Sequence, residues 1–352
     1  MSRYFYSYLY ILLVETILIS CENSEKKGYT PHSISGVIWG TAYHITVNGN
    51  TEDLMPEINA ALMQVDGVAN AFEKSSEISR LNSDGYIKGP SSLIQQLLTT
   101  SLRINKLTNG AFEPTIGPLV DLWGFGSSKN ENAAVSDSIV RHTLQSVGLE
   151  KVMLNDTCLY FAKKGMKLDF GAIAKGCGVD FVAIALLKSG IKDFMVEIGG
   201  EVRVAGVNPR GNSWAIQLDE PVLDSLGQHR QLGVLQLSDA SVATSGNYRN
   251  YRYDDKGNLI YHTISPITGY PVKTDILSAT IVAADCMTAD AYATATVVMG
   301  LQKARALIDR LVEDKKSGIY GAIFVTNATA NQVFSVHLCG LDADHVTYSN
   351  CQ

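Results

Sequence analysis

The chain has 352 residues, of which 46% are hydrophobic and 18% are charged, and its formal net charge is -6. This composition is typical of a folded globular protein and excludes a disordered one. Proteins that bind nucleic acids neutralise phosphates with clustered Lys and Arg, and this acidic chain has no basic stripe, so we expect no nucleic-acid partner.

The N-terminus resembles a bacterial lipoprotein signal. In residues 1–20 one Arg precedes an apolar run that is short for a membrane span. The stretch "LISC" resembles a lipobox, in which Cys21 becomes the lipidated first residue of the mature protein, and residues 21–35 follow as a polar tether. Glu15 within the run opposes insertion, and an uncleaved membrane anchor stays the alternative. Both interpretations place the rest outside the cytoplasm, and the lipobox places it in the cell envelope, lipid-anchored to a membrane and facing the periplasm or the exterior.

Five further cysteines are present: Cys158, Cys177, Cys286, Cys339 and Cys351. None forms a C-x-x-C pair, which argues against a zinc site or a thioredoxin-like motif. Cys177 and Cys286 lie among apolar residues, and we expect both to be buried small side chains. A disulfide among the five stays open.

The predicted elements begin with strand alternation at residues 36–49, followed by helical periodicity at residues 52–73, 91–110 and 136–148. From residue 151 onward, turn residues separate short strands at residues 151–156, 158–164, 194–207, 214–221 and 233–246. Further helices are predicted at residues 174–190 and at 287–300 running on into 301–313, before a hairpin at 320–337.

Blocks of strands with helices between them, without a βαβ rhythm, predict an α+β fold of mixed and antiparallel sheets packed with helices. No linker rich in Pro, Gly or Ser divides residues 36–345. We therefore expect a single domain over residues 36–345, followed by a short tail at 346–352.

The first candidate site is "KLDFGAIAKGCGVD", Lys167–Asp180. A strand that ends at Asp169, a turn of small residues and the start of a helix would expose backbone N–H groups and a positive helix end to an anion. The standard nucleotide fingerprints are absent. The alternative is structural, with Asp169 as a helix cap and Lys175 as a solvated side chain.

The second candidate site is "CMTADAYATATVVMG", residues 286–300. Asp290 and Thr294 are four residues apart and share one helix face. A carboxylate among Ala, Val and Met is costly unless it is paired, protonated or bound to a metal, and these oxygen ligands suit Mg²⁺ or Ca²⁺. The alternative makes Thr288 the N-cap and Asp290 an acid of the first turn.

The third candidate site is "HTISPITGYP", residues 262–271. Pro266, Gly269 and Pro271 predict a tight, rigid turn. His262 can take or give a proton at neutral pH, although lone histidines are more often structural. Three upstream residues either stack on a ring or cover an edge strand: Tyr248, Arg249 and Tyr251.

Taken together, these segments resemble the FAD:protein FMN transferase (ApbE-type) family. Eight landmarks follow the family's order over nearly all of the predicted domain: "WGTAYHITV", "SSEISRLN", "GAFEPTIGPLVDLWGFG", "LDFGAIAKG", "VEIGGEVRVAG", "ATSGNYRNY", "HTISPITGYP" and "TADAYATATVVMG". The resemblance implies a T-fold-like architecture and extended FAD with Mg²⁺ at its pyrophosphate. It implies an enzyme that cleaves this pyrophosphate, attaches FMN by a phosphoester to a Ser or Thr of another protein, and releases AMP.

The family's acceptors are subunits of membrane redox complexes, including sodium-translocating NADH:quinone reductases, and a Ser/Thr-Gly-Ala-Ser/Thr motif marks an acceptor. The resemblance also assigns site residues. The metal ligands are Asp290, Thr294 and the backbone carbonyl of Ala172. The FAD contacts are Trp39, Phe72, Ala111, Phe112, Glu113, Asp169, Lys175 and Ile264. Trp39 stands where the family often has Met, Phe72 stands where it often has Tyr, and position 175 varies.

We hypothesise that the rigid turn holds His262 beside the pyrophosphate, where it takes the proton of the acceptor hydroxyl. Asp290 is the rival base, but a bound cation lowers the proton affinity of a carboxylate. Two alternatives use the same residues. One is a Mg²⁺-dependent FAD pyrophosphatase that yields AMP and FMN, and the other is a lipoprotein that binds FAD without turnover. The presence of Asp290, Thr294 and His262 argues against the second.

Overall fold

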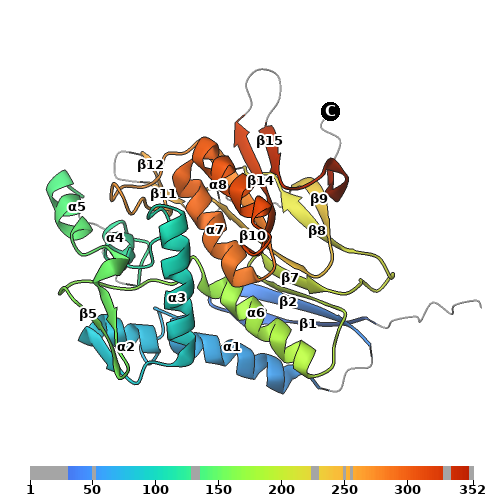
Figure 1. The fold of residues 1–352 in the computed structure, drawn as a ribbon, viewed down its shortest axis with the longest axis horizontal. Helices are drawn as coiled ribbons and strands as arrows, with labels where there is room; N and C mark the ends of the chain where they lie inside the picture. Colours follow the sequence, from blue (N-terminus) through green and yellow to red (C-terminus); the bar gives the residue numbers. More distant parts are fainter. Residues whose placement is uncertain are drawn as a thin grey trace, which may run out of the picture.

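An eight-stranded antiparallel sheet forms the centre of the structure (Figure 1), with the strand order β1-β2-β6-β7-β10-β13-β14-β15. The structure is a computed structural model that describes residues 31–49, 53–127, 135–222, 230–248, 251–253, 257–327 and 334–348. Helices pack on this sheet within one domain, which confirms the predicted α+β class with antiparallel sheets.

The strands of this sheet are β1 (Pro31–Ile38), β2 (Thr41–Asn48), β6 (Phe194–Ile198), β7 (Glu201–Ala205), β10 (Ala240–Gly246), β13 (Ile276–Ala283), β14 (Ile319–Asn327) and β15 (Phe334–Cys339). The predicted hairpin at residues 320–337 is therefore confirmed as β14 and β15. The strand pattern at residues 36–49 is a hairpin that turns at Trp39 and Gly40. The sequence analysis missed β13, because this strand is buried on both faces and lacks alternation.

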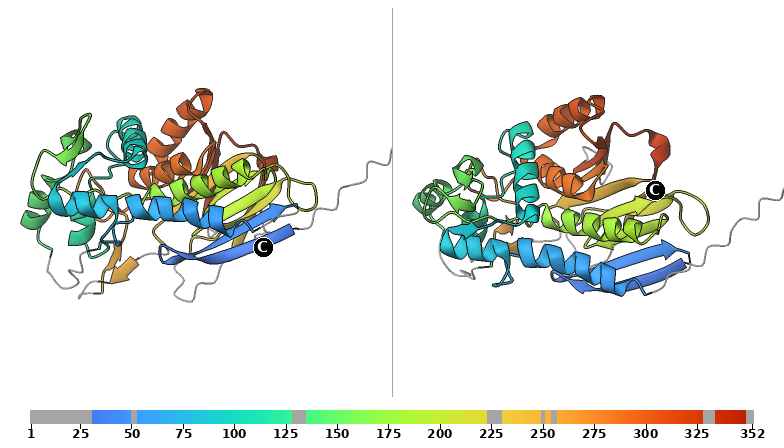
Figure 2. Two further views of the ribbon diagram at one scale, coloured as in Figure 1. Left: turned by 90° about the horizontal axis from the view of Figure 1, so that it is seen from below. Right: turned by 60° about the horizontal axis from the view of Figure 1, so that its bottom comes forward.

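Five helices gather on one side of the sheet (Figure 2): α1 (Met55–Ala69), α3 (Ser92–Leu107), α6 (Ala174–Lys188), α7 (Cys286–Met299) and α8 (Leu301–Glu313). The sequence predicted α1, α3 and α6, and it predicted the residues of α7 and α8 as one helix. The predicted continuous run over residues 287–313 is wrong, because Gly300 has φ of 75° and separates α7 from α8. A left-handed residue ends an α-helix, and glycine adopts this conformation without steric cost.

A smaller sheet covers part of the opposite face. Its order is β16-β9-β8, formed by β8 (Trp214–Asp219), β9 (Gln231–Leu237) and β16 (Val346–Tyr348). Val202 and Val242 of the large sheet pack against Trp214 and Leu235 of the small one. Their sequence neighbours point to the helices instead, because successive residues of a strand face opposite sides. The first paired strand, β1, begins at residue 31, and the last, β16, ends at residue 348. Both ends lie outside the predicted domain, residues 36–345.

Shorter elements lie beyond one end of the large sheet (Figure 1, left). They are α2 (Glu77–Asp84), α4 (Gly117–Leu122), α5 (Asp137–Leu144), η1 (Leu149–Lys151), β3 (Tyr86–Lys88), β4 (Val152–Leu154), β5 (Cys158–Phe161), β11 (Tyr251–Tyr253) and β12 (Leu259–Tyr261), while η2 (Ala343–His345) precedes β16. The predicted strand that ends at Asp169 is wrong, since Lys167 makes an isolated bridge to Ile116 and belongs to no strand.

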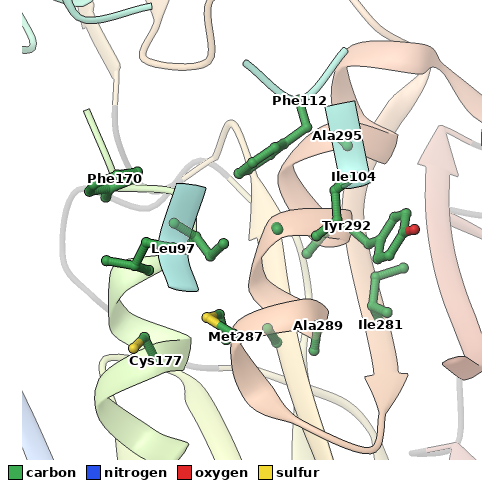
Figure 3. Close-up of a cluster of buried hydrophobic side chains, with 14 of the residues drawn as sticks. Leu97, Ile104, Phe112, Phe170, Cys177, Ile281, Met287, Ala289, Tyr292 and Ala295 are labelled. Carbon is green, nitrogen blue, oxygen red and sulfur yellow. The ribbon is translucent and has the colours of Figure 1, made fainter. Parts of the chain in front are cut away.

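The largest apolar cluster joins α3, α6 and α7 (Figure 3), where Cys177 of α6 lies near Met287 of α7. Cys177 and Cys286 are buried thiols, as predicted, and burial raises the pKa of each. Cys158 and Cys339 are also free thiols. Cys351 lies outside the described residues, as do the predicted signal peptide and Cys21.

Within the described residues, none of the helices combines the length and the hydrophobicity that crossing a membrane requires.

Candidate functional site

The candidate site lies where α6 and α7 meet, and Gly176 sets how closely they approach. A Cβ atom at position 176 would overlap the backbone carbonyl of Cys286 and press on the Cβ of Asp290. Only glycine therefore fits this position without moving one helix. The close contact brings the start of α6 against the second turn of α7.

Each of the two helices supplies a carboxylate to the N-terminus of the other. Asp290 of α7 accepts a hydrogen bond from the backbone N–H of Gly176 at 3.0 Å, and α6 has no side-chain cap of its own. Asp180 of α6 accepts from the N–H groups of Cys286 and Met287 at 3.0 and 2.9 Å. N-terminal N–H groups lack partners within their own helix, so these bonds satisfy donors that would otherwise be orphaned.

Asp180 is also paired with Arg203 of β7, at 2.6 Å. Burial raises the pKa of Asp180 to about 6, while Arg203 and the two N–H groups oppose that rise. The carboxylate of Asp180 therefore forms both the ion pair with Arg203 and the two hydrogen bonds to the start of α7.

Asp290 is 2% exposed and lies beyond the first turn of α7, so the interpretation that it is an acid of the first turn is wrong. The N-cap of α7 is Asp285 rather than Thr288, and Asp290 follows one turn later. Burial raises the pKa of Asp290, and this rise is opposed by the charge of Lys175 and by the Gly176 N–H.

Lys175 connects two carboxylates rather than extending into solvent. Its Nζ atom lies 2.8 Å from Oε1 of Glu201 and 3.9 Å from Oδ1 of Asp290. Burial alone would lower the pKa of Lys175, but the charges of Asp290 and Glu201 outweigh it and raise this pKa. Burial likewise raises the pKa of Glu201, to about 7, against the opposing charge of Lys175.

The oxygen atoms at this contact fit a hard divalent cation. Thr294 lies one turn after Asp290, and its hydroxyl is 3.0 Å from that of Ser245 on β10. Oε2 of Glu201 is buried and has no hydrogen-bond partner among the described residues. No group of three or more His, Cys, Asp or Glu side chains able to hold a metal occurs in the described ranges. Mg²⁺ is usually bound by one or two carboxylates together with waters and substrate phosphates, so the donor set fits this ion.

The predicted ligand Ala172 precedes α6 by two residues, in the turn that carries Asp169. Asp169 does not cap the helix, because its Oδ1 accepts from the N–H of Gly171 at 2.7 Å. Its own N–H donates to the carbonyl of Pro114, which places the segment 111–114 beside it. Burial raises the pKa of Asp169.

Hydrogen bonds to the Glu113 carboxylate stabilise the segment that follows α3, residues 111–115. The carboxylate accepts from the N–H and hydroxyl of Thr115, from the amide of Asn105 and from the N–H of Leu149, at 2.7 to 3.1 Å. Ala111 and Phe112 are buried. An FAD contact of these residues stays a prediction, since the carboxylate is already used within the protein.

Trp39 and Phe72 differ in exposure. Trp39 has φ of 51°, a conformation that few residues other than glycine adopt. Its indole N–H donates to Asp66 at 2.9 Å, and its ring packs so closely on α6 that a Cβ at Gly178 would overlap it. Phe72 is 72% exposed. An FAD contact of either ring stays a prediction.

His262 lies in the turn that the sequence predicted. Gly269 has φ of 79°, its N–H donates to the carbonyl of Ser265 at 2.8 Å, and its carbonyl accepts from Trp123 at 2.8 Å. Ile264 is buried and forms an isolated bridge with Pro271. The ring of His262 is half-buried and faces Phe125, with 6.3 Å between the ring centroids.

The upstream tyrosines differ in their surroundings. Tyr248 is buried, and Tyr251 packs edge-on against Tyr253 in β11. Arg249 lies outside the described residues.

Sequence reasoning missed three polar residues at the α6–α7 contact: Asp180, Glu201 and Ser245. One signal was present, because Glu201 and Arg203 alternate with valines in β7 and mark a polar stripe on a buried strand. The partners of these residues are far apart in the chain, so periodicity does not reveal them.

Comparisons with known proteins show which proteins this chain is similar to. The model of the ApbE family matches residues 39–316. A protein of Vibrio cholerae named FAD:protein FMN transferase is 34% identical over 301 residues, which are 83% of this chain and 87% of that protein. A protein of Haemophilus influenzae with the same name is 34% identical over 291 residues, 79% of this chain and 83% of its own.

Solved structures are similar as well. The flavin transferase ApbE of Vibrio cholerae superposes with a TM-score of 0.76 at 30% identity, covering 88% of this chain and 97% of that one. The apo form of the Pseudomonas stutzeri flavinyl transferase ApbE gives a TM-score of 0.76 at 27% identity, over 88% and 95% of the two chains.

The ion pair at the site yields a stability prediction. Lys175→Met should lower the free energy of unfolding at about pH 8 by about 2 kcal/mol, because it leaves Glu201 buried without its cation. The loss is no larger because a third of the lysine side chain is exposed and water screens its charge. Burial raises the pKa of Glu201 above its unfolded value, so this carboxyl binds a proton on folding and its cost grows as pH rises. The loss should therefore shrink towards about pH 5.

The matched control is the double variant Lys175→Met/Glu201→Gln, which removes both charges and should recover most of the loss. Denaturant unfolding at the two pH values, without added divalent cations, measures all three proteins. Equal destabilisation of the single and the double variant would contradict the prediction.

Proposed function

The chain belongs to the ApbE family and is an enzyme that transfers FMN from FAD to a protein, and we propose that it does so with Mg²⁺ bound at the α6–α7 contact and a Ser or Thr hydroxyl as acceptor. One observation carries the proposal. The buried carboxylate of Asp290 lies at the N-terminus of α6, so a negative oxygen and a positive helix end meet at one point.

Asp290, Thr294 and the carbonyl of Ala172 are the proposed ligands. The ion would supply Lewis-acid stabilisation of the charge that develops on the phosphoryl oxygens. The chain is acidic overall and would repel a pyrophosphate, so a bound cation would supply the positive charge that such a ligand needs. Lys175 and the N–H groups at the start of α6 add positive charge to the same place.

The chemical step transfers a phosphoryl group. The acceptor hydroxyl oxygen forms a bond to the phosphorus of the FMN half, the bond between that phosphorus and the bridging oxygen breaks, and AMP leaves. We propose that His262 takes the proton of the hydroxyl. The turn around Gly269 holds the residues that follow the histidine, from Thr263 to Val272, and a positioned base contributes about 10²–10⁴-fold. Asp290 is a weaker base once a cation binds it.

The remaining residues bind and orient FAD in this proposal: Trp39, Phe72, Ala111, Phe112, Glu113, Asp169 and Ile264. The fixed ring of Trp39 and the exposed ring of Phe72 offer stacking surfaces. The bond from Asp169 to Pro114 supports a shared role, because it joins two of the predicted contact segments.

We also propose that the acceptors are flavoprotein subunits of membrane redox complexes that carry a Ser/Thr-Gly-Ala-Ser/Thr motif, and that Cys21 is lipidated and holds the enzyme at a membrane of the cell envelope. In cells that express Cys21→Ser, the enzyme should move from the membrane to the soluble fraction. Equal membrane association of the two forms would contradict the anchor.

The function predicts a fluorescent product. The protein from Glu22 onward, incubated with FAD, Mg²⁺ and an acceptor domain that carries the motif, should give flavin fluorescence on the acceptor after a denaturing gel. EDTA and Asp290→Ala should both abolish the band, because each removes the cation. AMP and FMN without a band for several such acceptors would indicate a pyrophosphatase, and FAD that binds unchanged would indicate a binding protein.

The role of His262 predicts a separate effect. His262→Ala should slow single-turnover transfer by about 10²–10⁴-fold while FAD affinity stays within about twofold, because the base acts on the acceptor hydroxyl and not on FAD. His32→Ala, which changes an exposed histidine on β1, is the matched control and should transfer at the wild-type rate. Near-normal transfer by His262→Ala would show that another group takes the proton.

A further inference from the structure

The turn of the β1–β2 hairpin contains a residue that its backbone does not favour. The two turn residues are Trp39 and Gly40, which lie between the last paired positions of the strands. Both have positive φ, 51° and 74°. Two-residue turns of this kind favour Asn-Gly or Gly-Gly, because a larger side chain is strained at positive φ. Strain of this sort persists only where the surrounding structure holds the residue, and it gathers at functional sites.

The hydrogen-bond partner of Trp39 is also unfavourable in its own element. Asp66 lies in the last turn of α1, where the negative end of the helix dipole disfavours a carboxylate. The Asp66 side chain does not cap the helix, because the N–H of Asn70 donates to the backbone carbonyl of Asp66 instead. Neither Trp39 nor Asp66 is therefore explained by its local structure. Residues that break a local rule in this way mark functional or strained sites.

Two contacts hold the indole ring of Trp39. Its N–H donates to Oδ1 of Asp66 at 2.9 Å, and the ring packs on α6 at Gly178, where a Cβ atom would overlap it. The hydrogen bond sets the rotation of the ring, and the helix contact limits its displacement. Trp39 is only half-buried, so part of this fixed ring stays accessible to a ligand.

The contact with α6 brings the ring close to the α6–α7 site. Gly178 follows Gly176 by two residues, and the N–H of Gly176 donates to Asp290. Two residues span about 3 Å along a helix axis, so the indole ring and the proposed cation site meet the same part of α6. α1, which carries Asp66, packs beside α6 (Figure 1).

Asn70 connects this hydrogen bond to the second aromatic residue assigned to FAD. Its Nδ2 donates to the same Oδ1 of Asp66 at 2.8 Å, and its Oδ1 accepts from the backbone N–H of Phe72 at 2.9 Å. The carbonyl of Asn70 accepts from the hydroxyl of Ser76 at 2.7 Å, which holds the turn after α1. Two polar side chains thus join Trp39 to the backbone of Phe72.

We propose that Asp66 is a positioning residue for FAD: it fixes the plane of the Trp39 indole, so that a flat ring of FAD meets a surface already in place. Asn70 orients the Asp66 carboxylate and ties it to the turn of Phe72. This inference rests on the proposed function, because it assumes that Trp39 contacts FAD. A ring that is fixed before binding loses less conformational entropy when the ligand arrives, so the hydrogen bond raises FAD affinity.

The Kd for FAD, measured with Mg²⁺ and without an acceptor, tests the proposal. Asp66→Ala should raise this Kd by about fivefold, because the indole N–H loses its acceptor. Asp66→Asn keeps an acceptor oxygen at the same place and should stay within about twofold of the wild type. Glu57→Ala, which removes an exposed carboxylate from the same helix, is the matched control and should leave the Kd unchanged.

A double-mutant cycle separates positioning from a structural role. Trp39→Phe keeps an aromatic ring but lacks the N–H, and it should also raise the Kd by about fivefold or more. In the Trp39→Phe background, Asp66→Ala should change the Kd by less than about twofold, since no bond is left to lose. Denaturant unfolding shows which variants are folded, and Trp39→Phe tests the same bond from the donor side if Asp66→Ala does not fold.

The outcomes distinguish this inference from the function. Failure of the wild type to bind FAD would contradict the function itself, and an unchanged Kd in Trp39→Ala would overturn both the FAD contact and this inference. Weaker binding by Trp39→Ala with an unchanged Kd in Asp66→Ala would overturn the inference alone. Additive losses in the cycle would do the same, and so would a loss in Asp66→Asn equal to that in Asp66→Ala.

Discussion

The exchange of carboxylates between α6 and α7 is the interaction on which the site depends. Asp290 satisfies an N–H group at the start of α6, and Asp180 satisfies two at the start of α7. Neither aspartate belongs to the helix that it completes. Because Gly176 lies at the contact, the helices approach closely enough for both bonds, and a displacement of either helix would break them together. The same geometry therefore stabilises the core and positions the carboxylate of Asp290, which we propose as a metal ligand.

This arrangement concentrates charge in a chain that is acidic as a whole. Lys175 lies between Glu201 and Asp290, and the positive end of α6 points to the same place. Buried charges are costly unless they are paired, so each ionic group here is held by a partner on another element. The apolar packing of α3, α6 and α7 excludes water from one side of the site (Figure 3). In the proposed function, electrostatic interactions with a pyrophosphate bound here would be stronger than in water.

The sequence predicted the parts of the site that depend on local spacing. Asp290 and Thr294 share a face of α7 because they are four residues apart, and the turn at Gly269 follows from its glycine and prolines. The partners of Asp290 and Thr294 could not be predicted from local spacing, because Gly176 and Ser245 lie 114 and 49 residues away in the sequence. β13 was missed because burial on both faces removes the alternation that marks a strand. The strand expected before Asp169 is absent because that stretch makes a single bridge to Ile116 and turns through Gly171.

In the proposed function a cation held by α7 and the pyrophosphate of FAD occupy one site, so each should strengthen binding of the other. The most direct measurement is the Kd for FAD with and without Mg²⁺, in the wild type and in Thr294→Val, without an acceptor. Mg²⁺ should tighten FAD binding to the wild type by about tenfold or more, and Thr294→Val should lose most of this effect. Equal FAD affinity with and without Mg²⁺ in the wild type would show that the two ligands do not share a site.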